Sequence, residues 1–130
     1  WCPEEKQEMY KMLLVDTTVW VSHLREGNIG LTNSLNDGDV VCHPFIIGEL
    51  ACGHLRNRSE ILSLLQTLPL VIQAEHEEVL PFIENNKLMG KELGYIDIHL
   101  LASAVLAQTP IWTLDKKLNE VSIRLGLGKT

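Results

Sequence analysis

Short apolar runs that alternate with longer segments of helical periodicity limit the fold of this chain more than any other feature. Each run is largely apolar, as expected of a strand that is buried on both faces of a sheet. Alternation of such strands with amphipathic helices predicts an α/β fold of three layers, α/β/α, with a central parallel sheet. The expected strands are residues 12–15, 39–43, 70–73 and 111–114, and the expected helices are residues 18–26, 44–55, 61–68, 74–93, 95–108 and 115–126.

Local signals predict where these helices begin and end. Thr18 is expected to cap the first helix and Gly27 to end it. The fourth helical segment contains Pro81 and Gly90, so we expect either a kink or two separate helices there. Gly126 is expected to cap the last helix, because glycine readily adopts the left-handed conformation that ends many helices.

The length of 130 residues, nearly half of them hydrophobic, suits one compact domain. We assign this domain to residues 12–130 and interpret residues 1–11, which are polar and begin without Met, as an N-terminal extension or a cloning remnant. The apolar stretch over residues 98–107 is shorter than the roughly 20 residues that a membrane span requires. Three cysteines without a Cys-x-x-Cys pair fit a reducing cytoplasm.

Four acidic residues stand out because of the segments in which they lie. Asp16 and Asp115 directly follow strand-like runs, at the carboxyl end of the expected sheet, where α/β folds gather their ligand sites. Helical spacing puts Glu49 beside apolar or small residues three and four positions away, and it does the same for Asp97. We therefore expect all four carboxylates at positions that otherwise face the core.

Unpaired carboxylates in such positions are strongly unfavourable. No Lys or Arg lies within four residues of Asp16 or Asp97, and Lys116 and Lys117 flank only Asp115. A shared divalent cation would compensate the four acids, and their all-oxygen ligands suit Mg²⁺ or Mn²⁺ rather than zinc. Such a site supports phosphodiester hydrolysis, because the cation neutralises phosphate oxygens and lowers the pKa of an attacking water.

Most of these acids also have a structural explanation that the sequence leaves open. Asp16 and Asp115 suit the caps of the helices that follow them, and Asp97 is a first-turn acid if its helix begins at Tyr95. Glu49 lies in the middle of its helix and has no such explanation. The set of four is more persuasive than any one member.

Four segments, in order, resemble the PIN-domain ribonucleases, and within them the toxins of the VapBC toxin–antitoxin type: LLVDTTVW, IIGELACG, GYIDIHLLASA and WTLDKKL. The resemblance covers nearly the whole chain after its first eleven residues. It implies a Mg²⁺- or Mn²⁺-dependent endoribonuclease in which Asp16, Asp97 and Asp115 bind the metal. Glu49 would bind a second metal or orient the attacking water.

The resemblance also implies partners. The substrate would be RNA, possibly tRNA, and a VapB-like antitoxin would cover an apolar groove on the helices of residues 18–68. A homodimer is expected. The net charge of −6 excludes a diffuse cationic surface, so RNA must be held through local contacts. The candidates for phosphate contacts are Arg25, Arg56, Arg58, Lys91, Lys116 and Lys117.

Several residues near the acids complete the comparison with the family. The hydroxyls of Thr17 and Thr113 could hydrogen-bond the carboxylates, and Thr18 stands where the family often has Ser. Many relatives carry a further acid shortly after the last Asp, whereas two lysines follow Asp115 here. This departure argues against a second strongly bound metal.

Three other functions are compatible with parts of the sequence. LLVDTT resembles the haloacid-dehalogenase-like phosphatases, but these have a second Asp two positions after the first, where this chain has Thr18. The domain could instead be a housekeeping RNA-processing nuclease. It could also be a non-catalytic binding module whose acids are only caps and turns.

Overall fold

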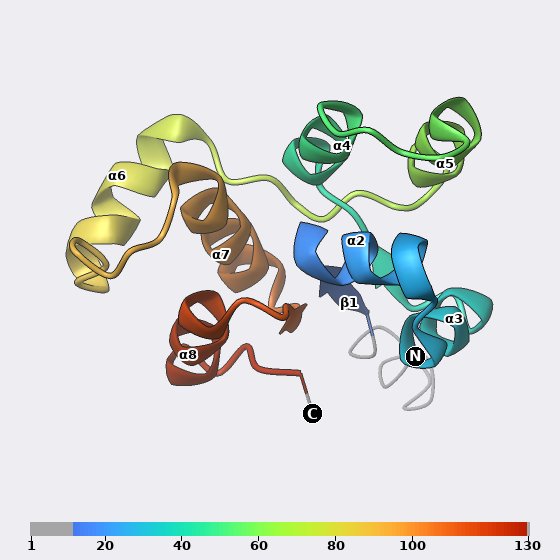
Figure 1. Cartoon of the computed structure of the whole chain (residues 1–130). Helices are drawn as coiled ribbons and strands as arrows, with labels where there is room; N and C mark the ends of the chain where they lie inside the picture. The colour runs from blue at the N-terminus through green and yellow to red at the C-terminus, as the bar shows by residue number, and fades with distance from the viewer. Residues whose placement is uncertain (1–11, 130) are drawn as a thin grey trace, which may run out of the picture.

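The computed structural model describes residues 12–129 and has a three-stranded parallel sheet at its centre (Figure 1). Strand β1 (Leu13–Val15) lies between β2 (Val40–Val41) and β3 (Ile111–Trp112), and both neighbours pair with it in parallel. The predicted α/β class with a central parallel sheet is confirmed. The proposed N-terminal extension, residues 1–11, lies outside the described residues.

Helices form the connections between the strands and cover the sheet. Their bounds are α2 Thr17–Glu26, α3 Ile29–Asn36, α4 Pro44–Ala51, α5 Arg58–Leu65, α6 His76–Asn85, α7 Tyr95–Ala107 and α8 Lys116–Arg124. In chain order, α2 and α3 separate β1 from β2, four helices separate β2 from β3, and α8 follows β3. None of the helices in the described part of the chain has the length and apolar character needed to cross a membrane.

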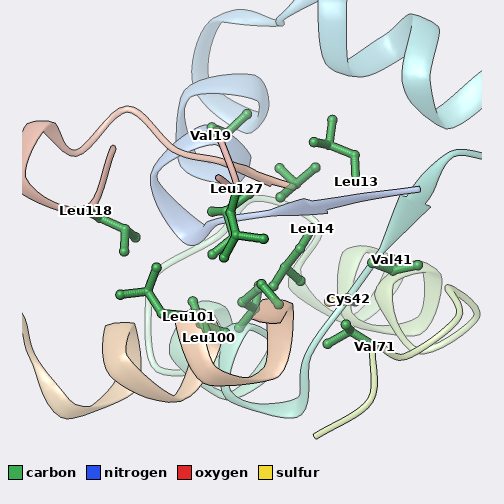
Figure 2. Packing of buried hydrophobic residues seen from close by; sticks show 14 of the residues in the cluster. Leu13, Leu14, Val19, Val41, Cys42, Val71, Leu100, Leu101, Leu118 and Leu127 are labelled. Atoms are coloured by element: carbon green, nitrogen blue, oxygen red, sulfur yellow. The ribbon is translucent and has the colours of Figure 1, made fainter. Parts of the chain in front are cut away.

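Strand β1 lies at the centre of the hydrophobic core. All three of its residues are buried, and Leu14 and Val15 have no exposed surface. Figure 2 shows Val19 of α2 on one side of the strand and Leu100 and Leu101 of α7 on the other. Because helices cover both faces, the strand requires apolar side chains at every position. The sheet is therefore the middle of three layers, as predicted.

Helix α3 forms where the sequence pattern predicts no helix. The Asn28 side chain accepts a hydrogen bond from Leu31 N at 3.1 Å and so caps the helix. Leu31 is completely buried and holds the helix against the core. Asn at a helix start is a recognisable signal. It was hidden because IGLTNSLN contains few apolar residues at helical spacing.

The strand predicted over residues 70–73 is wrong. Only Leu70 pairs, in a single parallel bridge with Cys42 at the end of β2. The segment then leaves the sheet, because Ala74 N donates a hydrogen bond to Ser103 Oγ of α7 at 3.0 Å. The apolar run of residues 70–73 is therefore an extended connection between α5 and α6 and not a strand.

Several helix ends differ from the sequence expectations: α4 ends at Ala51 and not at residue 55, α5 spans Arg58–Leu65 and not residues 61–68, and α6 ends at Asn85. The cap of α2 is Asp16 and not Thr18, because the side chain of Asp16 accepts a hydrogen bond from Thr18 N. Helix α6 contains Pro81, and the described residues around Gly90 form a loop with left-handed backbone (φ 69°) instead of a second helix. Gly126, with φ 78°, has the conformation predicted for the end of α8.

Candidate active site

Asp16 is the residue around which the candidate site is built. It directly follows β1, caps α2 and is only 3% exposed. Its Oδ2 atom accepts hydrogen bonds from the hydroxyls of Thr18 and Thr113, both at 2.8 Å. Two hydroxyl donors on one carboxylate oxygen stabilise the buried charge and fix its orientation. Thr18 and Thr113 are therefore the residues that position Asp16.

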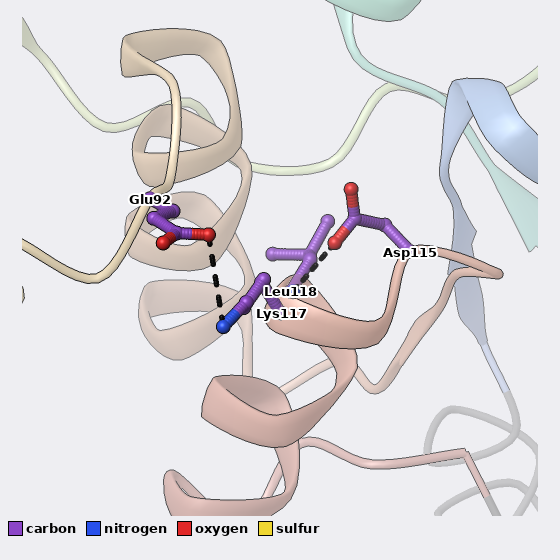
Figure 3. A network of polar contacts seen from close by, with 4 residues as sticks. All are labelled: Glu92, Asp115, Lys117 and Leu118. Carbon is purple, nitrogen blue, oxygen red and sulfur yellow. Dashed lines mark hydrogen bonds and ion pairs between the residues drawn. The ribbon is translucent and has the colours of Figure 1, made fainter.

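The same hydroxyls connect the end of β3 to the end of β1. Thr113 Oγ1 accepts a hydrogen bond from Asp115 N at 3.0 Å. Thr18 Oγ1 accepts one at 2.9 Å from Leu114 N, which also lies in the loop between β3 and α8. Asp115 caps α8, because its Oδ1 accepts a hydrogen bond from Leu118 N at 3.0 Å (Figure 3). Asp16 and Asp115 thus lie at the carboxyl ends of adjacent parallel strands, where the strand order reverses.

The other two predicted acids come from helices. Asp97 is half-buried in the first turn of α7, and its Oδ2 accepts a hydrogen bond from Gly94 N at 3.3 Å. Glu49 is exposed on α4, and its Oε1 accepts a hydrogen bond from the Thr17 hydroxyl at 2.9 Å. This last bond connects α4 to the start of α2, immediately after Asp16.

The charges of the four acids interact around Asp97. Burial raises the pKa of Asp97, and the hydrogen bond from Gly94 N opposes that shift. The negative charges of Asp16, Asp115 and Glu49 raise the pKa further. The fold therefore brings all four carboxylates into one electrostatic neighbourhood, although they come from four separate segments of the chain.

No basic side chain is paired with these acids in the part of the chain that the structure describes. The ion pair found there joins Lys117 Nζ to Glu92 at 3.6 Å, with both side chains more than half exposed (Figure 3). Such surface pairs contribute little to stability. Lys117 is thus engaged with Glu92 and not with the neighbouring Asp115. The local excess of negative charge has no protein counter-ion within residues 12–129.

Each of the four carboxylates has one oxygen that is held by the protein. The held atoms are Asp16 Oδ2, Glu49 Oε1, Asp97 Oδ2 and Asp115 Oδ1. No donor among residues 12–129 hydrogen-bonds the second oxygen of any of them. Four oriented carboxylates with open oxygen atoms and no basic partner are a donor set that fits a hard divalent cation.

The acids share a neighbourhood without forming a closed coordination shell. No three His, Cys, Asp or Glu side chains of the described residues are arranged to hold a metal ion as they stand. Repulsion between ionised carboxylates opposes a closer approach. Glu49 and Asp115 are exposed and have room to rotate. The assignment of the four acids as metal ligands stays a prediction.

The expectation that all four acids face the core is wrong for Glu49 and Asp115, which are exposed. Helix α4 buries Ile46 and Leu50, and Glu49 lies beside that buried face rather than on it. Asp115 precedes α8, whose buried face begins at Leu118. The helix-cap roles that the sequence left open are confirmed. A cap occupies only one carboxylate oxygen, so it is compatible with metal binding.

Two buried histidines lie on the elements that carry Glu49 and Asp97. Burial, assisted by the neighbouring His99, lowers the pKa of His43 to about 4, and burial also lowers the pKa of His99. His43 caps α4 by accepting a hydrogen bond from Phe45 N at 3.0 Å. His99 packs between the rings of Phe45 and Tyr95. Sequence spacing gave no signal for this row of rings, because its members come from α4 and α7.

A groove of about 540 Å³ opens beside the acids, between α2, α4 and the loop that follows α4. It lies on the helices for which the sequence predicted an apolar groove. Thr17 and Glu49 line it, so the groove is continuous with the candidate site. Its other lining residues are the apolar Val21, Leu24, Leu50 and Leu55, together with Gly53, Arg25, His54 and Arg56.

Sequence comparison finds related proteins that cover nearly the whole chain. The chain is 38% identical over 117 residues to Ribonuclease VapC32 of Mycobacterium tuberculosis strain CDC 1551 / Oshkosh. The match covers 89% of this chain and 94% of the relative, and the values for Ribonuclease VapC32 of strain ATCC 25618 / H37Rv are the same. No protein-family profile matches the chain.

Replacement of Thr113 tests the hydroxyl network. We expect Thr113→Val to lower the free energy of unfolding by roughly 1.5–3 kcal/mol, because it removes a donor to a buried carboxylate and an acceptor for Asp115 N. Thr113→Ser keeps the hydroxyl and is the matched control, with a smaller loss. Urea unfolding measures both, and equal stability of the Val and Ser variants would contradict the proposed role of the hydroxyl.

Replacement of Asp97 tests the repulsion among the acids. Because the pKa of Asp97 is raised in the folded state, the stability that this carboxyl contributes is present at low pH and lost as pH rises through its folded pKa. Asn is neutral at every pH and still accepts a hydrogen bond from Gly94 N. In chelator at pH 7 we therefore expect Asp97→Asn to raise Tm by about 2–5 °C, with the difference closing near pH 4.

The control for this measurement is Asp37→Asn, which changes an exposed acid at the end of α3. We expect it to leave Tm within about 1 °C of the unmodified protein. A lower Tm for Asp97→Asn at neutral pH in chelator would show that the four charges do not oppose one another.

Proposed function

The chain belongs to the VapC-like PIN-domain ribonucleases, and on that basis we propose that it is a Mg²⁺- or Mn²⁺-dependent endoribonuclease, the toxin of a type II toxin–antitoxin module. The observation that carries the proposal is the set of four carboxylates around Asp97 with no basic partner in the described chain. A structural role alone does not explain why these acids are gathered at one edge of the sheet.

Asp16, Asp97 and Asp115 would hold the divalent cation, and Glu49 would complete the acidic set. A bound Mg²⁺ or Mn²⁺ would supply a Lewis acid that neutralises charge on the scissile phosphate and lowers the pKa of an attacking water. The open oxygen of each carboxylate supports this assignment, because the protein already orients the opposite oxygen.

The other groups of the site have supporting roles in the proposal. Thr18 and Thr113 keep Asp16 in one orientation by donating to its Oδ2. Glu49 is exposed and anchored by Thr17 through Oε1, so its Oε2 is available to accept a proton from the attacking water. Because Glu49 and Asp115 are exposed, a long substrate could reach this side of the site from solvent.

Basic residues near the site would hold the RNA backbone. Arg25 and Arg56 line the groove that begins at Glu49, so they are the strongest of the six candidates for phosphate contacts. Arg58 instead donates to Ala51 O from Nε and Nη2, at 3.1 and 2.8 Å, and so holds the end of α4. Lys117 is paired with Glu92, which leaves Lys91 and Lys116 as further exposed cations.

The groove is the proposed site for a VapB-like antitoxin. Its apolar residues would receive an amphipathic segment, and its arginines would pair with acidic groups of the partner. Because Glu49 lines the groove, a segment bound there would also obstruct the catalytic acids. We further propose that the chain acts on cellular RNA in the cytoplasm, as a homodimer.

Cleavage of RNA by purified protein tests the function. We expect total RNA to be cut in Mn²⁺ and to stay intact in chelator, and Asp16→Asn to reduce the rate about 100-fold or more, because the buried acid loses its charge. Asp37→Asn is the matched control and should cut at the normal rate. Equal cleavage by Asp16→Asn and the unmodified protein would refute the mechanism.

Growth after induction in a host cell separates the toxin from a housekeeping nuclease. We expect induction of the chain to arrest growth and co-expression of the neighbouring antitoxin gene to restore it. Metal-dependent cleavage without growth arrest would favour an RNA-processing nuclease. Neither cleavage nor a response to metal would favour a binding module.

A further inference from the structure

We propose that Phe45 and Tyr95 form a stacking platform for an unpaired base of the substrate RNA, beside the catalytic acids. The inference rests on the proposed ribonuclease function and adds to it the two side chains that would hold one unpaired base next to the phosphate that is cleaved. Base stacking of this kind requires exposed aromatic faces that are held in place.

Both aromatic side chains are exposed where they adjoin the acids. Phe45 is 39% exposed and lies one helical turn before Glu49 on α4. Tyr95 is 45% exposed and lies two residues before Asp97 at the start of α7. The whole chain has only two Phe and two Tyr residues, so two of these four side chains are exposed at one place. Two aromatic rings are therefore accessible to a ligand at the starts of α4 and α7.

The buried His99 ring joins the two aromatic side chains into one rigid unit. The centroid of His99 is 5.0 Å from that of Phe45 and 4.6 Å from that of Tyr95, with interplanar angles of 67° and 83°. The Tyr95 hydroxyl also hydrogen-bonds His76 Nδ1 on α6. Because both rings are already fixed, a base that stacks on them loses little protein side-chain entropy.

Affinity for RNA at this surface is better explained by stacking of a nucleobase than by further contacts with phosphate groups. The chain has a net charge of −6, and two of its six candidate phosphate-binding cations are already engaged with other groups. Stacking supplies affinity that does not depend on positive charge and tolerates any base. A base within a duplex has both faces covered by its neighbours, so only an unpaired base can use the platform.

Cleavage of RNA with a missing base tests the proposal. The substrate is a short single-stranded RNA that the protein cleaves at one phosphate. It is compared with RNAs of the same sequence that carry one abasic nucleotide, placed in turn at each position near that phosphate. In Mn²⁺ we expect kcat/KM of the unmodified protein to fall about tenfold at one position. Phe45→Leu and Tyr95→Leu should each lower kcat/KM on intact RNA about tenfold. On the RNA that lacks the stacked base they should cleave nearly as well as the unmodified protein does, because the contact is already absent there.

One variant serves as the control. Leu106→Ala changes an exposed apolar residue at the far end of α7 and should behave normally with every substrate. Thermal unfolding of each variant verifies that the loss of activity is not a loss of fold.

The outcomes separate this inference from the ribonuclease function on which it rests. Two results would overturn the platform and leave the ribonuclease intact. One is normal cleavage of intact RNA by both Leu variants. The other is that, at every abasic position, the substitution lowers kcat/KM as much as it does on intact RNA. Variants that lose antitoxin binding but cleave normally would assign the surface to the protein partner and also overturn it. Absence of cleavage by the unmodified protein would overturn the ribonuclease and the platform together.

Discussion

The candidate site depends on the half-buried carboxyl of Asp97, whose pKa is raised by burial and further by the charges of three neighbouring acids. Asp16 and Asp115 come from the ends of adjacent strands, and Asp97 and Glu49 come from two helices, yet the charges of the other three all raise the pKa of Asp97. A fold tolerates such a cluster only if other interactions hold it together. Here three threonine hydroxyls and three backbone amides at helix starts hold one oxygen of each acid. Two of the hydroxyls and one amide bind Asp16, the third hydroxyl binds Glu49, and the other two amides bind Asp97 and Asp115. The unpaired second oxygens are the part of the arrangement that stability does not explain.

The sequence predicted the positions of these acids better than their surroundings. LLVDTT identified Asp16 at the end of a buried strand, and the alternation of strands and helices identified the parallel sheet, because both follow from local periodicity. The sequence does not reveal that Glu49 is exposed. Helical spacing shows which residues share a face of the helix, but not how much of that face the neighbouring element covers. The prediction that Thr18 caps the helix is also wrong. Its hydroxyl donates a hydrogen bond to Asp16, and Asp16 caps the helix. Contacts between distant segments, such as Thr113 with Asp16, leave no periodic signal.

One surface would serve both partners in the proposed function. Glu49 belongs to the acidic cluster and also lines the groove, together with Arg25 and Arg56. A segment that filled the groove would therefore contact Glu49, one of the proposed catalytic acids, and inhibition would require no change in the fold. Phe45 and Tyr95 lie on the same helices as Glu49 and Asp97, so base contacts and metal ligands would be positioned by the same two helices.

Anomalous diffraction from crystals grown with Mn²⁺ would locate the ion without reference to activity. We expect a peak in the anomalous difference map between the carboxylates of Asp16 and Asp97, with Asp115 or Glu49 turned toward it. A well-ordered site with no peak at saturating Mn²⁺, or a peak at acids outside this set, would contradict the claim that these four side chains are gathered to share a cation.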